Sequence, residues 1–572
     1  MRRWLLETTF SVDTGILRKE KRPMTWTQTY DPLHSWVLST LVAALPILVL
    51  LGLLAGFRVK PHWCAIAGAA TAIIVAVTIF GMPLSLAGMS FLFGVGFGVL
   101  KIAWIVLAAV FLYDISVYTG QFEVMKESVA GITADRRLQL LLVAFCFGAV
   151  IEGAAGFGAP VAIAGAFMIG LGFRPFHAAA LNLIANTSPV AWGSIGTPVH
   201  TLAAVSGLPE SDLSAMIGRI LPITGILVPF WLVRAMVGWR ETLEVLPAIL
   251  VVGCSFSLTQ YLWSNHVDAN LVDIAAGGIS LVATLVFFRY WRPRRTWRFA
   301  DERAGTIGGG AGHTTREILR AWMPFAILSI VVLVWGLPSI KGLMNRATTP
   351  IWNVPYLHNA VTRAAPVVTQ PTPEAARFDF NWLSATGTGC FVAAIVAGLL
   401  LGLSLRQLAA IFWGTVRRMK LAFVAISFML GLGFTTRYSG LDAVLGLAFT
   451  RTGWLFPFFG TYLGWLGVAL TGSDTSSNAL FGSLQRITAQ QLNLDPVLMC
   501  AANSAGGVMG KMVDAQSICV ATSATDQVGN EGIIFRYVFW HSVALAAVVG
   551  AIVLLYAYVF PGAVPHGTTI GR

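Results

Sequence analysis

The sequence predicts an all-α polytopic membrane protein built from two repeats of inverted topology. Two observations lead to this prediction. Of the 572 residues, 56% are hydrophobic and 11% are charged, and the mean hydropathy is +0.74, whereas a soluble domain carries about 25% charged residues. In addition, two apolar stretches interrupted by glycine recur about 320 residues apart. We expect about 12 membrane crossings, two re-entrant hairpins and two discontinuous helices.

The two interrupted stretches repeat each other at a nearly constant spacing. Gly148 to Pro160 reads GAVIEGAAGFGAP, and Gly467 to Asn478 reads GVALTGSDTSSN. Matching residues lie 319 to 321 positions apart, as seen for Gly153 and Gly472, Tyr118 and Tyr438, Pro175 and Pro496, and Asn182 and Asn503. Paired interrupted segments at matching places in two apolar halves are typical of secondary transporters and indicate where their binding site lies.

Apolar runs of about 18 residues or more, such as Trp36 to Phe57 and Leu271 to Phe288, are long enough to cross the hydrocarbon core as helices. The net charge of +12 does not indicate nucleic-acid binding, because the basic residues lie in short loops as the positive-inside rule expects. The six cysteines have neither a CxxC pair nor a zinc spacing. We therefore expect no metal site, no disulfide framework and no cofactor besides a coupling ion.

The basic loops predict the orientation. Arg289 to Arg320 contains eight arginines and is placed in the cytoplasm, and the charge-poor loop from Lys341 to Phe380 is placed outside. Both chain ends are then external, where the six basic residues among positions 1–23 would violate the rule. We expect residues 1–23 to be a mis-called N-terminal extension, with translation starting at Met24.

The repeats divide the chain into segments. The first repeat is predicted to span 24–205. It contains three spans, then a hairpin at 138–173 and a broken helix at 177–205. Linking spans over 206–288 and the cytoplasmic basic loop over 289–320 follow. The second repeat is predicted to span 321–528, with a hairpin at 454–492 and a broken helix at 497–528. The last span and the C-terminus follow at 529–572. The first hairpin enters from the cytoplasm and the second from outside, which inverts the halves.

The hairpin tips are predicted at Gly153–Pro160 and Gly472–Asn478, and the helix breaks at Gly193–Pro198 and Gly506–Gly510. Irregular backbone at membrane depth is tolerated where it is buried in protein or lines a watery cavity. Helix ends expose free N–H and C=O groups, and helix N-termini attract anions. We therefore expect these four interruptions to meet and to bind a small carboxylate.

Uncharged donors are dense at these interruptions, and Lys511 adds a positive charge beside the second break. The predicted substrate-binding residues are Ser473, Thr475, Ser476, Asn478, Asn186, Thr187, Ser188, Asn503, Ser504 and Lys511. Under the alternative interpretation, the hydroxyl and amide groups only satisfy buried backbone at the helix breaks. Lys511 could likewise pair with Asp514 or Asp474 instead of the substrate.

Three carboxyl groups lie at the interruptions. Glu152 and Asp474 belong to the two tips, and Asp514 follows the second break. A carboxylate inside the membrane is costly unless it is paired or protonated, so it is a functional candidate by default. We predict that a proton-coupling group is among Glu152, Asp474 and Asp514. The alternative for each is a structural helix cap or an ion pair.

At these residues the chain resembles the lactate permease family. The matching stretches are Gln121-Phe122 after Tyr118-Thr-Gly, Phe147–Pro160, Phe378–Gly387, Leu463–Leu480, Ala502–Met512 and Gln516–Ile518. The similarity extends from about Thr25 to Pro561 and leaves residues 1–23 outside. The resemblance implies an inner-membrane symporter that moves lactate, and often glycolate, together with a proton.

We therefore expect a multi-pass carrier in the bacterial cytoplasmic (inner) membrane that imports L-lactate, and also D-lactate or glycolate, by proton symport. Its partners would be this 2-hydroxy monocarboxylate and the lipid bilayer, and the sequence leaves the oligomeric state open. A Na⁺-coupled carrier of another small organic anion is the alternative. A transport-like sensor or a membrane-embedded enzyme is disfavoured, because the sequence contains neither a soluble signalling domain nor a catalytic motif.

Overall fold

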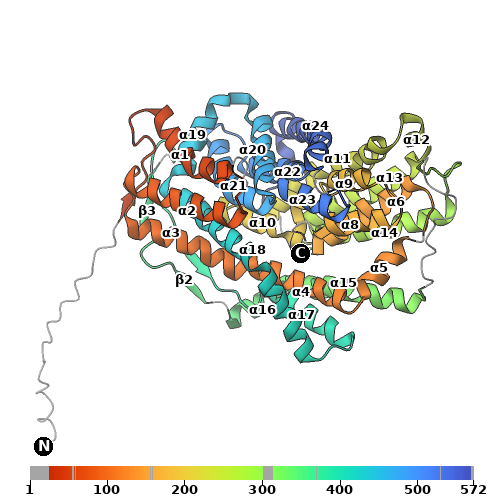
Figure 1. Cartoon of the computed structure of the whole chain (residues 1–572). Helices are drawn as coiled ribbons and strands as arrows, with labels where there is room; N and C mark the ends of the chain where they lie inside the picture. Colours follow the sequence, from red (N-terminus) through yellow and green to blue (C-terminus); the bar gives the residue numbers. More distant parts are fainter. Residues whose placement is uncertain are drawn as a thin grey trace, which may run out of the picture.

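The computed structural model describes residues 25–53, 57, 59–130, 132–154, 156, 159–299, 313–348, 350–368, 370–527 and 530–567. The predicted N-terminal extension and the glycine-rich middle of the basic loop lie outside the described residues, as do three positions of the first hairpin tip. Most of the described chain is helical (Figure 1). The all-α prediction therefore holds for the bulk of the molecule.

The first half of the chain consists of helices with short connections. They are α1 (Trp36–Leu51), α2 (Pro61–Thr78), α3 (Leu84–Phe97), the π-helical η2 (Gly98–Ala103), α4 (Trp104–Tyr118), α5 (Gln121–Ala130), α6 (Arg136–Leu140), the π-helical η3 (Leu141–Phe147), α7 (Gly148–Ala154), α8 (Ala159–Gly170), α9 (Pro175–Ala185), η4 (Val190–Trp192), α10 (Gly193–Ser206), α11 (Glu210–Met236), α12 (Trp239–Glu244), α13 (Leu246–His266) and α14 (Val272–Tyr290).

The second half begins after the basic loop. Its helices are α15 (Thr315–Gly336), α16 (Pro338–Thr348), α17 (Thr386–Leu400), α18 (Leu405–Ser439), α19 (Leu441–Phe449), η5 (Thr450–Leu455), α20 (Phe456–Thr471), α21 (Asp474–Gln491), α22 (Pro496–Gly510), α23 (Ala515–Ala524), α24 (Glu531–Tyr558) and η6 (Pro561–Ala563).

The helices make this a multi-pass membrane protein. Among the described residues, seven helical stretches are long and apolar enough to cross a membrane, and five shorter apolar helices accompany them. Large apolar side chains on α13 and α14, such as Leu258 and Val282, point outward with 60% and 59% of their surface exposed. Exposed apolar surface of this kind is expected where helices face lipid.

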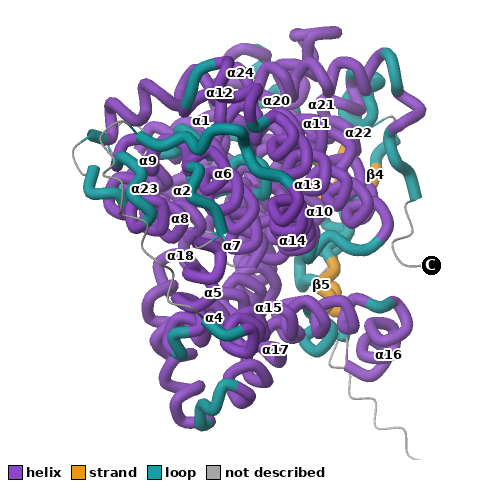
Figure 2. Tube along the Cα trace, turned by 90° about the vertical axis from the view of Figure 1, so that its right-hand side faces the viewer, coloured by secondary structure: helices purple, strands orange, loops and turns teal. Residues whose placement is uncertain are grey.

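The helices pack into a large body with a side limb. In the body, α20 packs on α22 and α24, α22 on α11, and α11 on α13, which packs on α14 (Figure 1). In the limb, α17 packs between α4 and α15, as Figure 2 shows below the body. The long helix α18 connects the two parts, because it contacts α2, α3 and α4 as well as α21.

The loop that was predicted to be external forms two small sheets, one of which also includes a strand from the N-terminal segment. Strand β2 (Ile351–Asn353) pairs antiparallel with β5 (Arg377–Asp379), while β3 (Val361–Arg363) pairs with β1 (Trp26–Thr27) and β4 (Thr372–Pro373). These strands were not predicted from the sequence. Each has only two or three residues, which is too short for the alternation of apolar and polar residues that identifies a strand.

The second helix break lies further along the chain than predicted. Helix α22 continues unbroken to Gly510, and the chain leaves helical geometry only at residues 511–514. The prediction of a break at Gly506–Gly510 is therefore wrong. A Cβ atom on Gly506 would lie 2.0 Å from the Thr461 carbonyl oxygen, and one on Gly510 would lie 2.3 Å from that of Trp465. These glycines are needed for the close approach of α22 to α20, as is common where membrane helices pack.

Candidate functional site

The second predicted hairpin tip presents a capped helix N-terminus inside the protein. Gly472 ends α20 in the left-handed region, with φ of 73°, where a glycine is favoured. Ser473 is extended and its hydroxyl accepts a hydrogen bond from the Ser476 N–H at 3.3 Å. It is thus the N-cap of α21. Asp474 follows in the first turn and is buried, so its carboxylate is placed where the helix dipole stabilises negative charge.

Asp474 organises a polar cluster between α21 and α22. Its Oδ2 atom accepts hydrogen bonds from the Ser504 hydroxyl at 2.5 Å and the Asn478 amide at 3.3 Å. Asn503 donates to the Asn478 side-chain oxygen at 2.9 Å, and Gln485 donates to Asn503 at 3.2 Å. All five side chains are buried. Four of them were predicted from the sequence, and the structure brings them into one network.

The first helix break is a strained segment. Helix α9 ends at Ala185, and Ser194, Ile195 and Gly196 all have positive φ (47°, 58° and 71°) before regular helix resumes at Thr197. A β-branched residue such as Ile195 rarely adopts this conformation, and such strain is concentrated at functional sites. The segment coincides with the break predicted at Gly193–Pro198.

This break touches both hairpins. From α21, the Asn478 amide donates to the Pro198 carbonyl at 3.2 Å, and the Thr475 and Thr197 hydroxyls are 3.5 Å apart. From α7, the Glu152 carboxyl packs against Gly193, where an added Cβ atom would lie 2.6 Å from the Glu152 Oε1 atom. The contact with Pro198 uses a main-chain carbonyl near the irregular segment, where helix ends leave such groups free to bind side chains.

The second break completes the cluster. The Lys511 ammonium donates to the Gly472 carbonyl at 2.5 Å and lies 3.6 Å from the Asp514 carboxylate. Asp514 also accepts a hydrogen bond from the Ser517 N–H at 2.7 Å, which caps α23. Lys511 and Asp514 are within electrostatic reach of Glu152. The four interruptions therefore meet, and a buried lysine lies among them.

The sequence matches a family model. The model described as L-lactate permease covers residues 39–560. This chain belongs to the L-lactate permease family. The glycolate permease GlcA of Escherichia coli K12 is 45% identical, over 94% of this chain and 99% of that protein. The L-lactate permease of the same organism is 43% identical, over 94% and 100%, and that of Bacillus subtilis is 41% identical, over 95% and 100%.

The permease also has distant structural neighbours. Neisseria gonorrhoeae MtrF has a TM-score of 0.48 at 11% identity, over 91% of this chain and 99% of that one, and Alcanivorax borkumensis YdaH has a TM-score of 0.33 at 14% identity, over 76% and 86%. Membership of a permease family identifies the chain as a transporter rather than an enzyme.

Some predicted site residues of the permease are already satisfied by backbone. The Thr187 hydroxyl donates to the Ile184 carbonyl at 2.8 Å, as expected at a helix end. Asn186 and Ser188 differ. Both residues are buried, but within the described residues neither the side-chain amide of Asn186 nor the hydroxyl of Ser188 has a hydrogen-bond partner. Ser476 is partly exposed at the tip of α21. The site thus mixes satisfied and free polar groups.

Sequence reasoning about the permease missed Asp273 of α14 and Gln260 of α13. Both side chains are fully buried. Asp273 is within electrostatic reach of Glu152 in α7, and Gln260 donates a hydrogen bond to the Ser188 carbonyl, between α9 and the first break, at 3.3 Å. The signal was an acid at the start of the apolar run Leu271 to Phe288. Helices α13 and α14 lie outside the two segments that the sequence predicts as repeats, 24–205 and 321–528.

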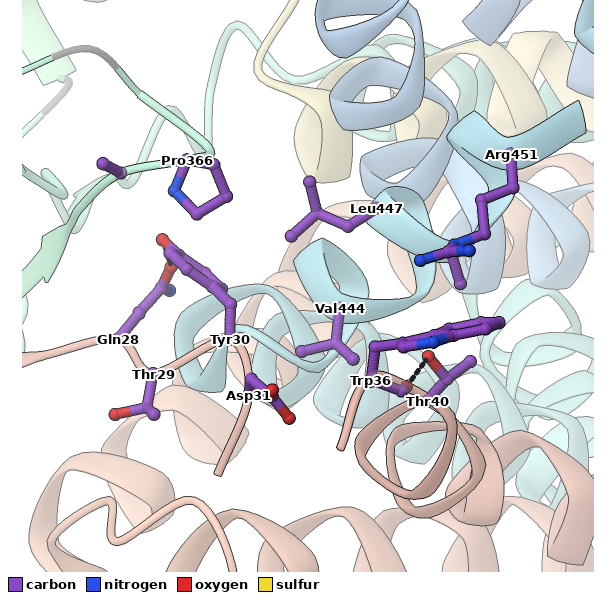
Figure 3. A pocket seen from close by; sticks show the side chains of 12 residues that line it. Gln28, Thr29, Tyr30, Asp31, Trp36, Thr40, Pro366, Val444, Leu447 and Arg451 are labelled. Atoms are coloured by element: carbon purple, nitrogen blue, oxygen red, sulfur yellow. Dashed lines mark hydrogen bonds between the residues drawn. The ribbon is translucent and has the colours of Figure 1, made fainter. Parts of the chain in front are cut away.

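A cavity of about 480 Å³ lies elsewhere on the permease (Figure 3). Its walls come from the N-terminal segment, α1, the loop near Pro366 and α19. Arg451 stacks over the Trp36 ring there at 3.7 Å. None of the predicted site residues lines this cavity, so it is separate from the four interruptions.

Proposed function

We propose that the permease imports L-lactate, together with the related D-lactate and glycolate, by proton symport across the bacterial cytoplasmic membrane. The proposal rests on relatives named L-lactate permease and glycolate permease that match nearly the whole chain at 41% to 45% identity. Lactate and glycolate are both 2-hydroxy monocarboxylates, so one site with an anion-binding group and hydroxyl partners can accept both.

The proposed architecture is an inverted repeat with about 12 crossings, two re-entrant hairpins and two discontinuous helices. The helix positions support a repeat, since the starts of α3, α9 and α11 precede those of α18, α22 and α24 by 321 residues each. Helices α11 and α24 come after residues 205 and 528, so the proposed repeats extend beyond the ends predicted from the sequence. Helices α13 and α14 then form an addition between the halves, and the hairpins act as alternate gates.

The observation that carries this proposal is the buried polar cluster at the four interruptions. The N-terminus of α21 and the Lys511 ammonium suit a carboxylate, and the neighbouring groups suit the 2-hydroxyl. The substrate ligands in this proposal are Ser473, Thr475, Ser476, Asn478, Asn186, Thr187, Ser188, Asn503, Ser504 and Lys511. Lys511 would exchange the Gly472 carbonyl for the substrate carboxylate.

The coupled proton requires a group that binds and releases it within the protein. The buried carboxyls at the site, Glu152, Asp474 and Asp514, are the candidates. Protonation of one of them when the site is open outward would favour entry of the anion, because buried charge is costly unless it is compensated. Release of the proton inside would then favour release of the substrate.

Uptake of radiolabelled L-lactate by proteoliposomes containing the full chain tests the function. With an inward proton gradient and no Na⁺, we expect accumulation above the external concentration, and a protonophore should abolish it. An excess of unlabelled glycolate should compete, whereas an excess of acetate, which lacks the hydroxyl, should compete less. Accumulation that requires Na⁺, or none with lactate under either gradient, would contradict the proposal.

A further inference from the structure

Asp273 is a buried acid without a matching base. Its side chain is fully buried, and within the described residues neither carboxyl oxygen has a hydrogen bond of ordinary geometry, although the Trp192 backbone and the Gln260 side chain lie near enough to act on the carboxyl. Glu152 is also buried, with 4% of its surface exposed, and its Oε2 atom is likewise without a partner in the described chain. Buried polar atoms in folded proteins almost always have partners, so such a concentration of free oxygens needs an explanation.

The two carboxyls come from helices in direct backbone contact. Helix α7 packs against the first turn of α14 (Figure 2). A Cβ atom on Gly153, the residue after Glu152, would lie 2.7 Å from the Ile274 nitrogen and 3.0 Å from the Asp273 Cβ. The absence of a side chain at Gly153 therefore lets the first hairpin place Glu152 within electrostatic reach of Asp273.

Neutral polar groups that are also incompletely bonded surround the pair. The Asn186 side chain lies beside Glu152, and the Gln260 side chain lies beside Asp273. Within the described residues, both polar atoms of the Asn186 amide and the Gln260 Oε1 atom have no hydrogen bond. Both side chains are more than nine-tenths buried. These groups can hydrogen-bond a carboxyl in either protonation state, as a proton-binding site requires.

The other charges near the pair are accounted for. Lys511 and Asp514 act on Glu152 and are 3.6 Å from each other. Three titratable side chains on the elements packed around α7 and α14 have close partners: Cys146 contacts Ser280 at 3.4 Å, His200 binds Glu210 at 2.7 Å and Asn270 at 2.9 Å, and Asp114 binds Arg418 at 2.6 Å. The other titratable side chains on α4, α13 and α14, which include Tyr113, Cys254, Tyr261 and Arg289, are not among the groups acting on Glu152 or Asp273. Asp273 therefore has Glu152 as its nearest charged neighbour among the groups acting on it.

Two carboxyls that are close together and shielded from water cannot both be ionised, and they titrate as a pair. We propose that Glu152 and Asp273 share one proton and that this pair is where the coupled proton binds, with Asp273 supplied by a helix outside the repeat. While the pair faces external water both carboxyls can be ionised, and one carboxylate oxygen then takes a proton from that water and forms an O–H bond. The shielded pair holds this single proton, and the O–H bond breaks, with the proton passing to cytoplasmic water, when the pair opens inward. The inference rests on the proposed proton symport.

Each of the other acids at the site is engaged through one of its oxygens. Asp474 Oδ2 accepts from Ser504 and Asn478, while its Oδ1 has no hydrogen bond within the described residues; Asp514 Oδ1 caps α23, while its Oδ2 lies 3.6 Å from Lys511. Hydrogen bonds and a nearby cation favour the ionised form of a carboxyl. Lys511 acts on Glu152 as well, but no cation is among the groups acting on Asp273. This favours the Glu152–Asp273 pair as the group that changes protonation during transport.

The test compares two lactate assays in proteoliposomes containing the full chain. One measures accumulation driven by an inward proton gradient, and the other measures counterflow at equal pH, which needs no net proton movement. Asp273→Asn is expected to lose accumulation down to the equilibrium level while keeping counterflow. The control is Asp114→Asn, which removes a largely buried carboxylate that pairs with the exposed Arg418. This variant should behave like the wild type in both assays.

A direct readout of the proton accompanies transport. In detergent, binding of lactate to the wild type should take up protons from a weakly buffered dye solution, and Asp273→Asn should bind lactate with that uptake lost. Full gradient-driven accumulation by Asp273→Asn overturns the inference. An equal loss of accumulation and counterflow also overturns it, provided that the variant has the melting temperature of the wild type. If Asp273→Asn does not fold, Glu152→Gln gives the same test, since removal of either carboxyl should abolish proton sharing.

The outcomes separate the two proposals. If the wild type fails to accumulate lactate under a proton gradient, the proposed symport itself is wrong. If the wild type accumulates lactate and Asp273→Asn does so equally well, symport stands and only the location of the proton is wrong.

Discussion

At the residue scale, Asp474 holds two elements of the site together. Its Oδ2 atom receives the Ser504 hydroxyl of α22 and the Asn478 amide of its own helix. A Cβ atom on Gly507 would lie 2.2 Å from its Oδ1, so there is little space for the carboxyl to move. In the proposed substrate site, these contacts would make Asp474 a group that positions the tip of α21.

Asp474→Asn should therefore impair substrate binding and proton-driven transport together. Hydrogen bonds to a charged group are worth about 1.5–3 kcal/mol, so we expect a loss of roughly tenfold or more in the apparent affinity for lactate. Counterflow and gradient-driven uptake in proteoliposomes, measured over a range of lactate concentrations, should fall in parallel. Loss of gradient-driven uptake alone would instead assign the coupled proton to Asp474.

Glu374 is the clearest case of a buried charge outside the membrane-spanning helices. Its carboxylate contacts Arg363 at 2.5 Å and Arg437 at 2.7 Å, and all three side chains are largely buried. Burial alone would raise the pKa of Glu374, but the charges of Arg437 and Arg363 outweigh it and hold that pKa below its ordinary value. The ion pairs fasten the loop of residues 350–385 to the end of α18.

The lowered pKa of Glu374 predicts how stability depends on pH. A carboxyl with a lowered pKa in the folded state contributes fully above its unfolded pKa of about 4.3, and the contribution is lost as the pH falls through the folded value. Thermal unfolding in detergent should thus be insensitive to this group between about pH 5 and 8 and should weaken below about pH 4. Glu374→Gln should remove this part of the acid dependence.

The same variant should lower stability at neutral pH. It leaves two buried arginines without their carboxylate, which costs about 3–5 kcal/mol for a broken buried pair. Asp379→Asn is the matched control in the same loop, because its pair with Lys101 is 55% exposed on the aspartate side and such pairs contribute at most about 1 kcal/mol. Equal melting temperatures for the two variants would show that the arginine cluster does not hold the loop.

At the element scale, the helix breaks show what the sequence can predict. Strain and free backbone groups appear at Ser194 to Gly196, where glycine, serine and proline made a break predictable. The glycines of α22 gave the same local signal, yet they lie in regular helix against α20. Glycine permits both a break and close helix packing, and only the neighbouring helix decides between them.

Gly506→Ala tests the packing interpretation. The added methyl group would lie 2.0 Å from the Thr461 carbonyl oxygen, so α20 and α22 must separate, and overpacking of this kind costs about 1–3 kcal/mol or more. The control is Gly414→Ala in α18, where nothing lies within 4 Å of the added atom and the better helix propensity of alanine should help by up to about 1 kcal/mol. Melting curves in detergent should move in opposite directions. A Gly506→Ala protein as stable as the wild type would contradict the prediction.

Asp273 shows the limit of reasoning from repeats. The repeat directs attention to segments that occur twice, and it identified Glu152, Asn186, Asp474, Asn503 and Lys511, which the structure brings together. Helices α13 and α14 lie outside the two predicted repeats. An acid at the start of a long apolar run looks like an ordinary span end until the first hairpin is seen to pack against it.

At the scale of the whole molecule, composition and hydrophobic run length were sufficient to predict a mostly helical multi-pass protein, because these depend on local properties of the chain. The assembly of the four interruptions also followed from the repeat, since irregular segments within the membrane must bury their polar groups against one another. The limb of α4, α15 and α17 and the small sheets could not be foreseen. They depend on contacts between segments up to several hundred residues apart, such as β1 with β3.

The proposed inverted arrangement makes a prediction about the whole chain that labelling can test. The loop near Gln370 should face outside and the basic loop near Arg294 should face the cytoplasm, because positively charged loops are retained inside. Both positions are exposed in the structure. In a background with the native cysteines replaced, a membrane-impermeant maleimide should label Gln370→Cys in intact cells, but Arg294→Cys only after permeabilisation. Labelling of both in intact cells, or the reverse pattern, would contradict the orientation and with it the direction from which each hairpin enters the membrane.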